Sequence, residues 1–314
     1  MKQPVFQFLL NKRVLIILLM LILVATLFTQ EFMTIGNIRN VLLQVATDGI
    51  IAIGMTYVII TGGIDLSVGS VVAMTSVITI FLQPYFGSGI GIVVAILAGL
   101  VTGLTNGLLV TRVGVSPFVT TLGTMTLVKG VALAISNSHT KSGIDPVFGE
   151  LAKQPVFGLP LATVVFLLLV VLAELFLVHS YNGRGFYAVG GNPEAAWLAG
   201  LNTKGYLLGA YVFCSIMAAI GGVFLTSRIN TGSPIIGGDT VTIAVSAVLL
   251  GGTSMAGGSG TIVGTLIGIL ILGILKNTMN LIGIGGYYQT IILGVLLVLM
   301  VLLDRLNFTR RVMT

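Results

Sequence analysis

Apolar residues along this chain are grouped into long stretches that short polar links separate. A helix needs about 20 mostly apolar residues to cross the apolar core of a bilayer. Ten stretches reach or approach that length: 14–30, 41–61, 67–84, 90–110, 117–136, 160–178, 206–227, 241–252, 260–277 and 287–303. The pattern predicts an all-α, polytopic membrane helical bundle of about ten transmembrane helices in a single domain, 1–314. The stretch 241–252 is short and runs into glycines, so it either spans fully or forms a broken or re-entrant helix.

The first stretch also has the charge pattern of a signal peptide. Lys2, Lys12 and Arg13 precede its apolar core, but no small-x-small cleavage site follows Phe28 or Thr29. We expect a retained helix.

The composition excludes a soluble globule. Hydrophobic residues make up 56% of the 314 residues and charged residues only 8%, and the mean hydropathy is +1.11. Soluble domains are about 25% charged. The net charge of +6 comes from basic residues between apolar stretches rather than from a patch, so we expect no nucleic-acid partner. With Cys214 as the one cysteine and only two histidines, His139 and His179, we expect no disulfide and no metal site.

The distribution of basic residues predicts the orientation, because cytoplasmic loops of membrane proteins are enriched in Lys and Arg. Ten spans with a cytoplasmic N-terminus place this set inside: Lys2, Lys12, Arg13, Arg112, Arg184, Lys204, Arg305, Arg310 and Arg311. The smaller outer set comprises Arg39, Lys141, Lys153 and Arg228, with Lys129 and Lys276 near outer helix ends. We therefore expect both termini in the cytoplasm.

A weak internal repeat relates the two halves of the chain. Asn106, Gly114, Leu122 and Gly123 recur at one constant offset as Asn277, Gly285, Leu293 and Gly294, and Ala73 and Val77 recur as Ala244 and Val248. The offset maps the second span onto the seventh, so the half-repeats, about 37–136 and 208–307, would be inverted. Chance identity in an apolar sequence is the alternative. Inverted repeats are common in transporters, with the transport pathway at their interface.

Two glycine rows predict close helix packing. Gly99, Gly103 and Gly107 repeat every four residues, and so do Gly260, Gly264 and Gly268. Small residues at this spacing form flat helix faces on which neighbouring helices pack.

Three motifs stand out in the links. The first, Thr61 to Ser70, reads Thr-Gly-Gly-Ile-Asp-Leu-Ser-Val-Gly-Ser. Its glycines can end one helix, and Asp65 or Ser67 can cap the next.

The second motif, Gly190 to Gly200, lies in the longest expected cytoplasmic loop, about 180–205. Asn192 suits an N-cap, Pro193 the first helical position and Glu194 the positive end of the dipole. We expect a short helix there whose small apolar residues contact a partner; a helix lying on its own membrane domain is the alternative.

The third motif, Gly251 to Thr261, is rich in glycine. A phosphate-binding loop would need a Gly-Lys pair opening a helix, and this chain has no such pair. We expect a tight turn between helices.

Together these stretches resemble the permease subunits of bacterial ATP-binding cassette (ABC) importers for monosaccharides, the ribose-type family. The likeness runs from about Asn37 to Asp304. It also includes three further stretches: Gly54-Met55-Thr56, Pro117-Phe118-Val119-Thr120-Thr121-Leu122-Gly123 and Tyr287-Tyr288-Gln289.

The resemblance implies a homodimeric pore in the bacterial inner membrane, with a cytoplasmic ATPase subunit and a periplasmic or lipid-anchored sugar-binding protein as partners, besides membrane lipid. It implies that Asn192, Pro193, Glu194, Ala195, Ala196 and Gly200 form the coupling helix that contacts the ATPase. It also marks a set of signature or gating candidates: Gly62, Gly63, Asp65, Ser67, Gly69, Asn106, Pro117, Phe118, Asn277 and Gln289. The chain departs from the family before Gly251, where Val241-Thr242-Ile243 replaces the usual Glu-Leu-Asp and the nearest acid is Asp239.

We expect the permease of an ATP-driven sugar importer that works by alternating access. ATP is hydrolysed by a partner, so we expect no catalytic residue and no cofactor in this chain. The rival is a secondary transporter with Asp48 as its ion site, because ionisable residues at membrane depth are functional candidates. Asp48 and Lys129 either pair or extend to the interface, and Glu174 is expected at the interface. A membrane-embedded enzyme is disfavoured, because no paired carboxylates, His cluster or nucleophile–base set falls at one depth.

Overall fold

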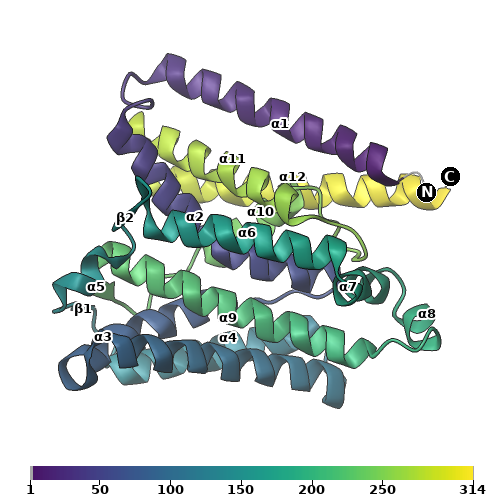
Figure 1. Ribbon diagram of the computed structural model, residues 1–314, viewed down its shortest axis with the longest axis horizontal. Coiled ribbons are helices and arrows are strands. Elements are labelled where there is room, and N and C mark those ends of the chain that lie inside the picture. Colours follow the sequence, from purple (N-terminus) through teal and green to yellow (C-terminus); the bar gives the residue numbers. More distant parts are fainter. Residues whose placement is uncertain (1–2, 314) are drawn as a thin grey trace.

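Long helices lie side by side in a computed structural model of the chain (Figure 1). It describes the backbone of residues 3–313 and the side chains of 14–302 and 304. The helices before the middle of the chain are α1 (Gln3–Phe28), α2 (Ile35–Ile60), α3 (Val68–Leu108) with a π-helical turn η1 (Leu109–Val113), α4 (Pro117–Ser136) and α5 (Pro146–Leu151). They are followed by α6 (Leu161–His179), α7 (Tyr181–Gly191), α8 (Pro193–Leu198), α9 (Thr203–Ile229), α10 (Thr240–Leu250), α11 (Ile262–Leu281) and α12 (Gly286–Met313).

Six of the described helices are long and apolar enough to cross a bilayer. They are α2, α3 with η1, α4, α6, α9 and α11, and shorter apolar segments occur in α1, α10 and α12. The prediction of a helical membrane protein is confirmed. The expected segments 67–84 and 90–110 are joined in α3, which bends back on itself at Gly87 (φ 76°, ψ 168°). After the bend the two arms pack closely. A Cβ added to Gly91 would lie only 2.8 Å from the Thr79 carbonyl oxygen.

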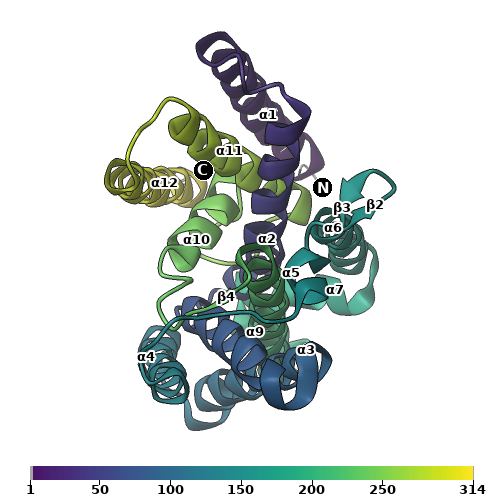
Figure 2. The ribbon, with the colours of Figure 1, turned by 90° about the vertical axis from the view of Figure 1, so that its left-hand side faces the viewer.

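The bundle has two ends, which we name the α5 end and the α8 end. They lie at the left and right of Figure 1, respectively. Viewed from the α5 end, α2 lies between a group made of α1, α10, α11 and α12 and a group made of α3, α4 and α9 (Figure 2). Accordingly, α2 is the most buried of the six candidate spans.

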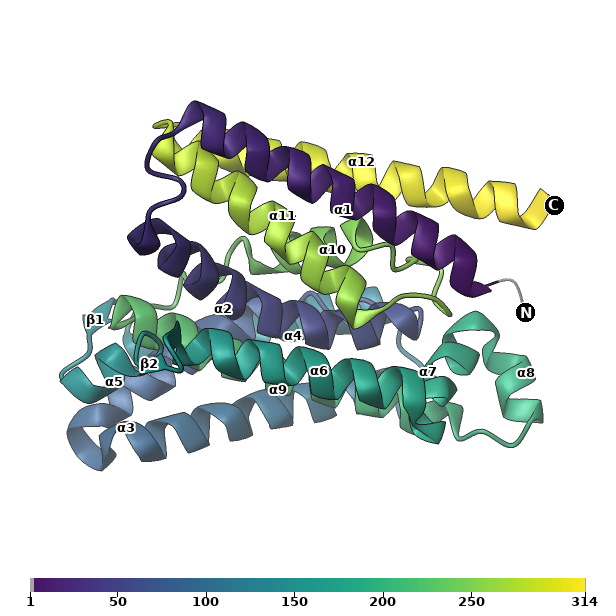
Figure 3. The ribbon, with the colours of Figure 1, turned by 45° about the horizontal axis from the view of Figure 1, so that its top comes forward.

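The glycine rows pack closely, as expected, except that Gly260 lies before the start of α11, against the Thr253 side chain. Gly99, Gly103 and Gly107 of α3 lie against α9, so closely that a Cβ on Gly103 would be 2.7 Å from the Cα of Val212. Gly264 and Gly268 of α11 lie against backbone carbonyls of Gly251 and Ala247. Leu18 and Ala25 of α1 share a small apolar cluster with Ile271 and Ile274 of α11, and the two helices lie side by side (Figure 3).

Helix α10 contains 11 residues, which gives a length of about 16 Å. It does not cross an apolar core of about 30 Å by itself. This favours the broken or re-entrant form over the full span for the segment 241–252.

The α5 end carries a cap, which we define as residues 137–160. It contains α5 and three of four two-residue strands: β1 (Lys141–Ser142), β2 (Pro155–Val156) and β3 (Leu159–Pro160). β1 pairs antiparallel with β4 (Thr231–Gly232), which follows α9, and β2 pairs with β3. These short ladders are the β-structure of the described chain, and the all-α prediction did not include them.

Of the basic residues expected inside, Arg112, Arg184 and Lys204 lie near the α8 end. The expected outer set lies at the α5 end: Arg39, Lys141, Lys153 and Arg228. The side chains of the other expected inner residues are outside the described ones: Lys2, Lys12, Arg13, Arg305, Arg310 and Arg311.

Candidate functional site

All three glycine-containing motifs meet at the α8 end. The Gly258 N–H donates to the Ile60 carbonyl at 2.8 Å. A Cβ on Gly190 would collide with that same carbonyl oxygen. Thus the end of α2, the end of α7 and the link between α10 and α11 touch at one point.

The contacts at this point are made by backbone atoms. Gly257 and Gly258 both have positive φ, at 84° and 71°. A Cβ on Gly257 would lie 3.0 Å from the Gly62 nitrogen, and one on Gly258 would lie 2.7 Å from the Cα of Gly191. We call Gly62, Gly190, Gly191, Gly257 and Gly258 the glycine junction. A side chain at most of these positions would force the three links apart.

Polar side chains from three other helices fasten the link 251–261. Glu174 of α6 accepts the first amide of α11 through Oε2, at 2.7 Å. Tyr187 of α7 donates its hydroxyl to the Gly260 carbonyl at 2.9 Å, and Asp304 of α12 accepts the Met255 amide at 3.0 Å. The link is therefore a longer, fastened loop rather than the expected tight turn.

The amino-acid sequence alone does not reveal these three anchoring roles. The residue pattern predicts an interfacial position for Glu174 and assigns no anchoring role to Tyr187 or Asp304. The position of Glu174 one turn before the end of an apolar helix marks it as unusual, but its partner is 88 residues away.

Next to the junction lies a buried polar cluster made by Asp65, Ser67, Asn106 and Thr124. Asp65 Oδ1 accepts from the Ser67 N–H at 2.9 Å and from the Ser67 hydroxyl at 2.6 Å. Asn106 Nδ2 donates to Ser67 Oγ at 2.9 Å, while its Oδ1 accepts from the Thr124 hydroxyl at 2.6 Å. Asp65, Ser67 and Asn106 are fully buried. The cluster ties the start of α3 to its far end and to α4.

Ser67 occupies the N-cap position of α3 but makes no capping hydrogen bond with its side chain. The Asp65 carboxylate accepts hydrogen bonds from Ser67 and Asn106. The capping interpretation therefore holds for the position of Ser67, whereas Asp65 holds the link itself in shape.

The expected short helix is present as α8. Asn192 is its N-cap and accepts the Ala195 amide at 2.9 Å, Pro193 opens the helix and Glu194 lies in the first turn. Gly200 has φ 82° and open space around it, so it is needed for its left-handed backbone and not for close approach.

Helix α8 projects from the bundle (Figure 3). Ala196 is buried, but Trp197 is 65% exposed and Leu198 is 73% exposed. Large apolar side chains exposed in this way on a polar loop are typical of a surface that contacts another protein. The small apolar residues Ala195 and Ala199 are exposed as well.

The other predicted residues lie apart from each other. Gly69 packs at the start of α3, where a Cβ would be 2.6 Å from the Gly237 carbonyl oxygen. Pro117 opens α4 and Phe118 is exposed beside it. Gly63 borders the Tyr211 hydroxyl.

Asn277 and Gln289 are at the opposite, α5 end. Asn277 exchanges two side-chain hydrogen bonds with Asn37, at 2.7 and 3.0 Å, and Gln289 donates to Asn280 at 2.7 Å. The predicted set thus divides into a group at the α8 end and a pair of contacts at the α5 end.

The possible pairing of Asp48 with Lys129 is wrong for the described residues. Asp48 lines a small pocket between α2 and α11 together with Gln44 and Lys276. Lys129 lies on the exposed face of α4.

The match to a known protein family covers the same part of the chain as the motifs. Residues 37–301 match the family model described as branched-chain amino acid transport system / permease component. No solved structure matches the chain.

Several curated relatives match nearly end to end. The ribose import permease protein RbsC of Bacillus subtilis (strain 168) is 38% identical over 294 residues, covering 92% of this chain and 90% of the relative. The D-allose transport system permease protein AlsC of Escherichia coli (strain K12) is 34% identical, covering 90% and 87%. The L-arabinose transport system permease protein AraH of the same strain is 33% identical, covering 93% and 89%. The chain therefore belongs to this family of transport-system permease components and is a multi-pass membrane transport protein rather than an enzyme.

Proposed function

We propose that this chain is the permease subunit of an ATP-driven ABC importer that carries a monosaccharide or a similar small carbohydrate across the bacterial inner membrane. The observation that carries the proposal is the end-to-end likeness to permeases named for ribose, allose and arabinose. The likeness covers nearly the full length of both chains, whereas a shared fragment would support the fold alone.

The proposed topology has ten membrane segments and both termini in the cytoplasm. Counting the two arms of α3 separately, the segments are α1, α2, the α3 arms, α4, α6, α9, α10, α11 and α12. The α8 end would then be cytoplasmic and the cap periplasmic. The basic residues described at each end support this orientation.

Two inverted half-repeats, about 37–136 and 208–307, support alternating access. Shifted by the constant offset, α2 overlaps α9, the two arms of α3 overlap α10 and α11, and α4 overlaps α12. α2 begins at the α5 end whereas α9 begins at the α8 end (Figure 1), as an inverted pair requires. In this scheme α10 is the short counterpart of the first α3 arm.

In the proposed mechanism α8 is the coupling helix and the ATPase subunit binds it. Movement of α8 passes to α7, and α7 ends in the glycine junction, where α2 and the α10–α11 link also end. The buried cluster of Asp65, Ser67 and Asn106 lies beside the junction, so these residues and Gly62, Gly63 and Gly69 are the gating candidates at this end. Pro117 and Phe118 belong to the same end, and Asn277 and Gln289 are candidates at the other.

The proposed complete transporter contains a second copy of this chain, a sugar-binding protein at the cap side and surrounding lipid. The exposed apolar side chains along the spans suit contact with either lipid or a second copy.

The test of the proposed function is uptake by proteoliposomes. Sugar uptake should require this chain, its ATPase subunit, ATP and a cargo-loaded binding protein, and it should persist when a protonophore is present. Asp48→Asn should retain uptake, because no ion needs to bind there. Uptake by this chain alone, driven by a proton or sodium gradient and lost in Asp48→Asn, would establish the secondary transporter instead.

Coupling through α8 has its own test. Gly200→Val should abolish uptake while the protein still inserts, because a β-branched residue is strained at φ 82°. Glu194→Lys should weaken ATPase binding, because it places a positive charge at the positive end of the helix dipole. Gly36→Val is the matched control, since Gly36 has open space and lies at the other end. Normal uptake in both coupling variants would show that α8 only connects α7 to α9 and does not couple transport to the ATPase.

A further inference from the structure

Helix α9 links the two ends of the molecule. It is one helix of 27 residues, about 40 Å long, and its sequence contains no proline. It begins just after α8, and its last residues lie under the cap (Figure 1).

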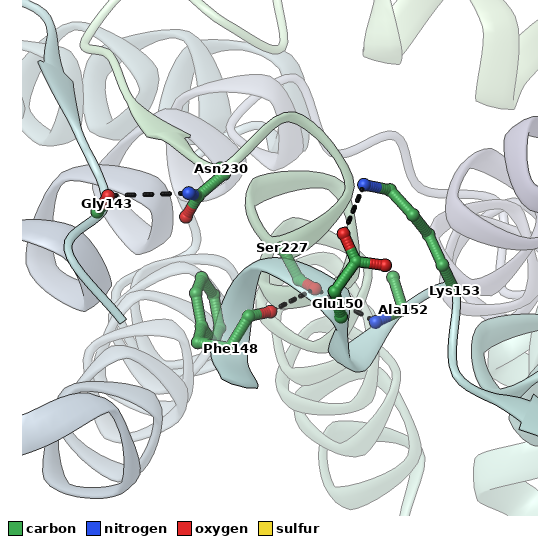
Figure 4. Close-up of polar contacts among 7 residues, drawn as sticks. All are labelled: Gly143, Phe148, Glu150, Ala152, Lys153, Ser227 and Asn230. Atoms are coloured by element: carbon green, nitrogen blue, oxygen red, sulfur yellow. Dashed lines mark hydrogen bonds and ion pairs between the residues drawn. The ribbon is translucent and has the colours of Figure 1, made fainter. Parts of the chain in front are cut away.

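At the α5 end, the hydroxyl of Ser227 pins the cap to α9. Ser227 Oγ donates to the Phe148 carbonyl at 2.6 Å and accepts the Ala152 amide at 2.9 Å (Figure 4). Both partners belong to α5 or its end, and Ser227 is fully buried. Because the hydroxyl is used as donor and acceptor at once, it holds α5 in one position relative to α9.

Asn230 makes a second attachment one turn further along. It has a left-handed backbone (φ 47°) and ends α9. Its carbonyl accepts the Gly143 amide at 2.9 Å, and its side chain also lies against Gly143 (Figure 4). The pairing of β1 with β4 continues this attachment.

The cap also bridges the bend of α3. Before the bend, Gln83 Oε1 accepts the Ile144 amide at 3.0 Å. After it, the Ser88 hydroxyl donates to Asp145 Oδ2 at 2.5 Å, and this hydrogen bond lowers the pKa of the Asp145 carboxyl. A displacement of the cap therefore acts on α9 and on both arms of α3.

At the α8 end, the connection to α9 is equally direct. The Leu201 amide donates to the Ala196 carbonyl at 3.0 Å, and Asn202 caps α9 by accepting the Gly205 amide at 3.0 Å. The ring of Tyr206 packs edge-on against Phe186 of α7, with centroids 5.1 Å apart. The start of α9 thus cannot move without α7 and α8.

We propose that α9 is a strut that transmits the position of the cap to the coupling helix, and that Ser227 is the positioning residue that pins the cap to this strut. The inference rests on the proposed function, in which α8 meets the ATPase and a soluble sugar-binding protein meets the cap side. A protein that binds the cap signals to the ATPase through a rigid helix rather than through the sugar path alone.

The test uses the complete transporter, with its ATPase and binding protein, in nanodiscs. Ser227→Ala removes the pin. Thr226→Val is the matched control, because the Thr226 hydroxyl bonds only to the Gly222 carbonyl within α9. Three quantities are measured: hydrogen–deuterium exchange of cap amides 145–152, basal ATP hydrolysis, and hydrolysis stimulated by cargo-loaded binding protein.

Ser227→Ala should raise exchange at the Ala152 amide by about tenfold, the effect of losing a buried hydrogen bond. It should leave basal hydrolysis unchanged and remove most of the stimulation. Thr226→Val should change neither the exchange of the cap nor the stimulation. If Ser227→Ala fails to insert, Asn230→Gly tests the second attachment of the cap to α9. Glycine keeps the left-handed backbone but removes the side-chain amide that donates to the Gly143 carbonyl at 3.4 Å, so cap exchange should rise and stimulation should fall in the same way.

Two results would overturn the inference. Unchanged cap exchange would show that Ser227 does not pin the cap, and raised exchange with full stimulation would show that the pin carries no signal. A wild-type transporter that shows neither ATP-dependent uptake nor stimulation would instead refute the proposed function, and the strut with it.

Discussion

Glu174 caps a helix from which it is far removed in sequence. Its carboxylate accepts the amides of Ile262 and Val263 at 2.7 and 3.3 Å, where the first turn of α11 has unpaired donors. Glu174→Gln keeps an acceptor but loses the charge that the helix dipole favours. We expect a loss of about 1 kcal/mol in the free energy of unfolding, measured by denaturation of the purified protein in detergent.

Glu150→Gln is the control for that measurement. Glu150 pairs with Lys153 at 3.2 Å, but its side chain is 71% exposed. Exposed ion pairs contribute little, so the control should be nearly neutral. Equal losses in the two variants would show that the charge of Glu174 does not stabilise α11.

The reciprocal hydrogen bonds of Asn37 and Asn277 make the two residues one energetic unit. Replacing either by alanine leaves the other amide buried without its partner. In a double-mutant cycle of Asn37→Ala and Asn277→Ala, we expect the double variant to lose less stability than the sum of the singles, by about 1 kcal/mol. Additive losses would show that the pair is not coupled.

Local rules were enough to predict some residues. Asn192, Pro193 and Gly200 sit as their capping and backbone preferences require, because those preferences act within one turn. Glu174, Tyr187 and Asp304 could not be assigned in the same way, since each bonds a backbone group at least 49 residues away. Only the folded arrangement brings such groups together.

At the scale of elements, the two glycines that end α7 should differ in how well they tolerate a side chain. Gly190→Ala should disturb the junction, because the new Cβ collides with the Ile60 carbonyl oxygen. Gly191→Ala should be tolerated, since its Cβ would lie 3.8 Å from the Cα of Gly258. Overpacking typically costs 1–3 kcal/mol, so we expect a loss of about 2 kcal/mol for Gly190→Ala in unfolding measurements, together with impaired uptake.

Alanine favours helix more than glycine does, so a loss in Gly190→Ala cannot come from helix propensity. A variant as stable as wild type would show that the junction yields easily.

The apolar stretches predicted most helix positions, because the bilayer requires long runs of apolar residues. They could not predict the cap, since its two-residue strands and six-residue α5 are too short for any periodic pattern. They also separated α3 into two segments, because Pro84 and Gly87 mark a bend, but gave no indication that its arms pack against each other.

For the whole molecule, the orientation in the membrane can be tested by labelling. Lys204 lies exposed at the α8 end and Lys153 lies exposed in the cap. In a Cys214→Ser background, Lys153→Cys should react with an impermeant thiol reagent in intact cells, whereas Lys204→Cys should react only after permeabilisation. The reverse result would invert the proposed topology.

The glycine junction and α8 also differ in how much they can vary between related transporters. A junction made of backbone atoms has no side chains with which to recognise one partner over another. α8, with Trp197 and Leu198 exposed, presents side chains that can differ from one importer to the next. In the proposed mechanism, in which the ATPase binds α8, the choice of ATPase among several importers in one cell would be encoded in the few residues of α8. A transplant of α8 alone would then re-pair a permease with a different ATPase, with its membrane core unchanged.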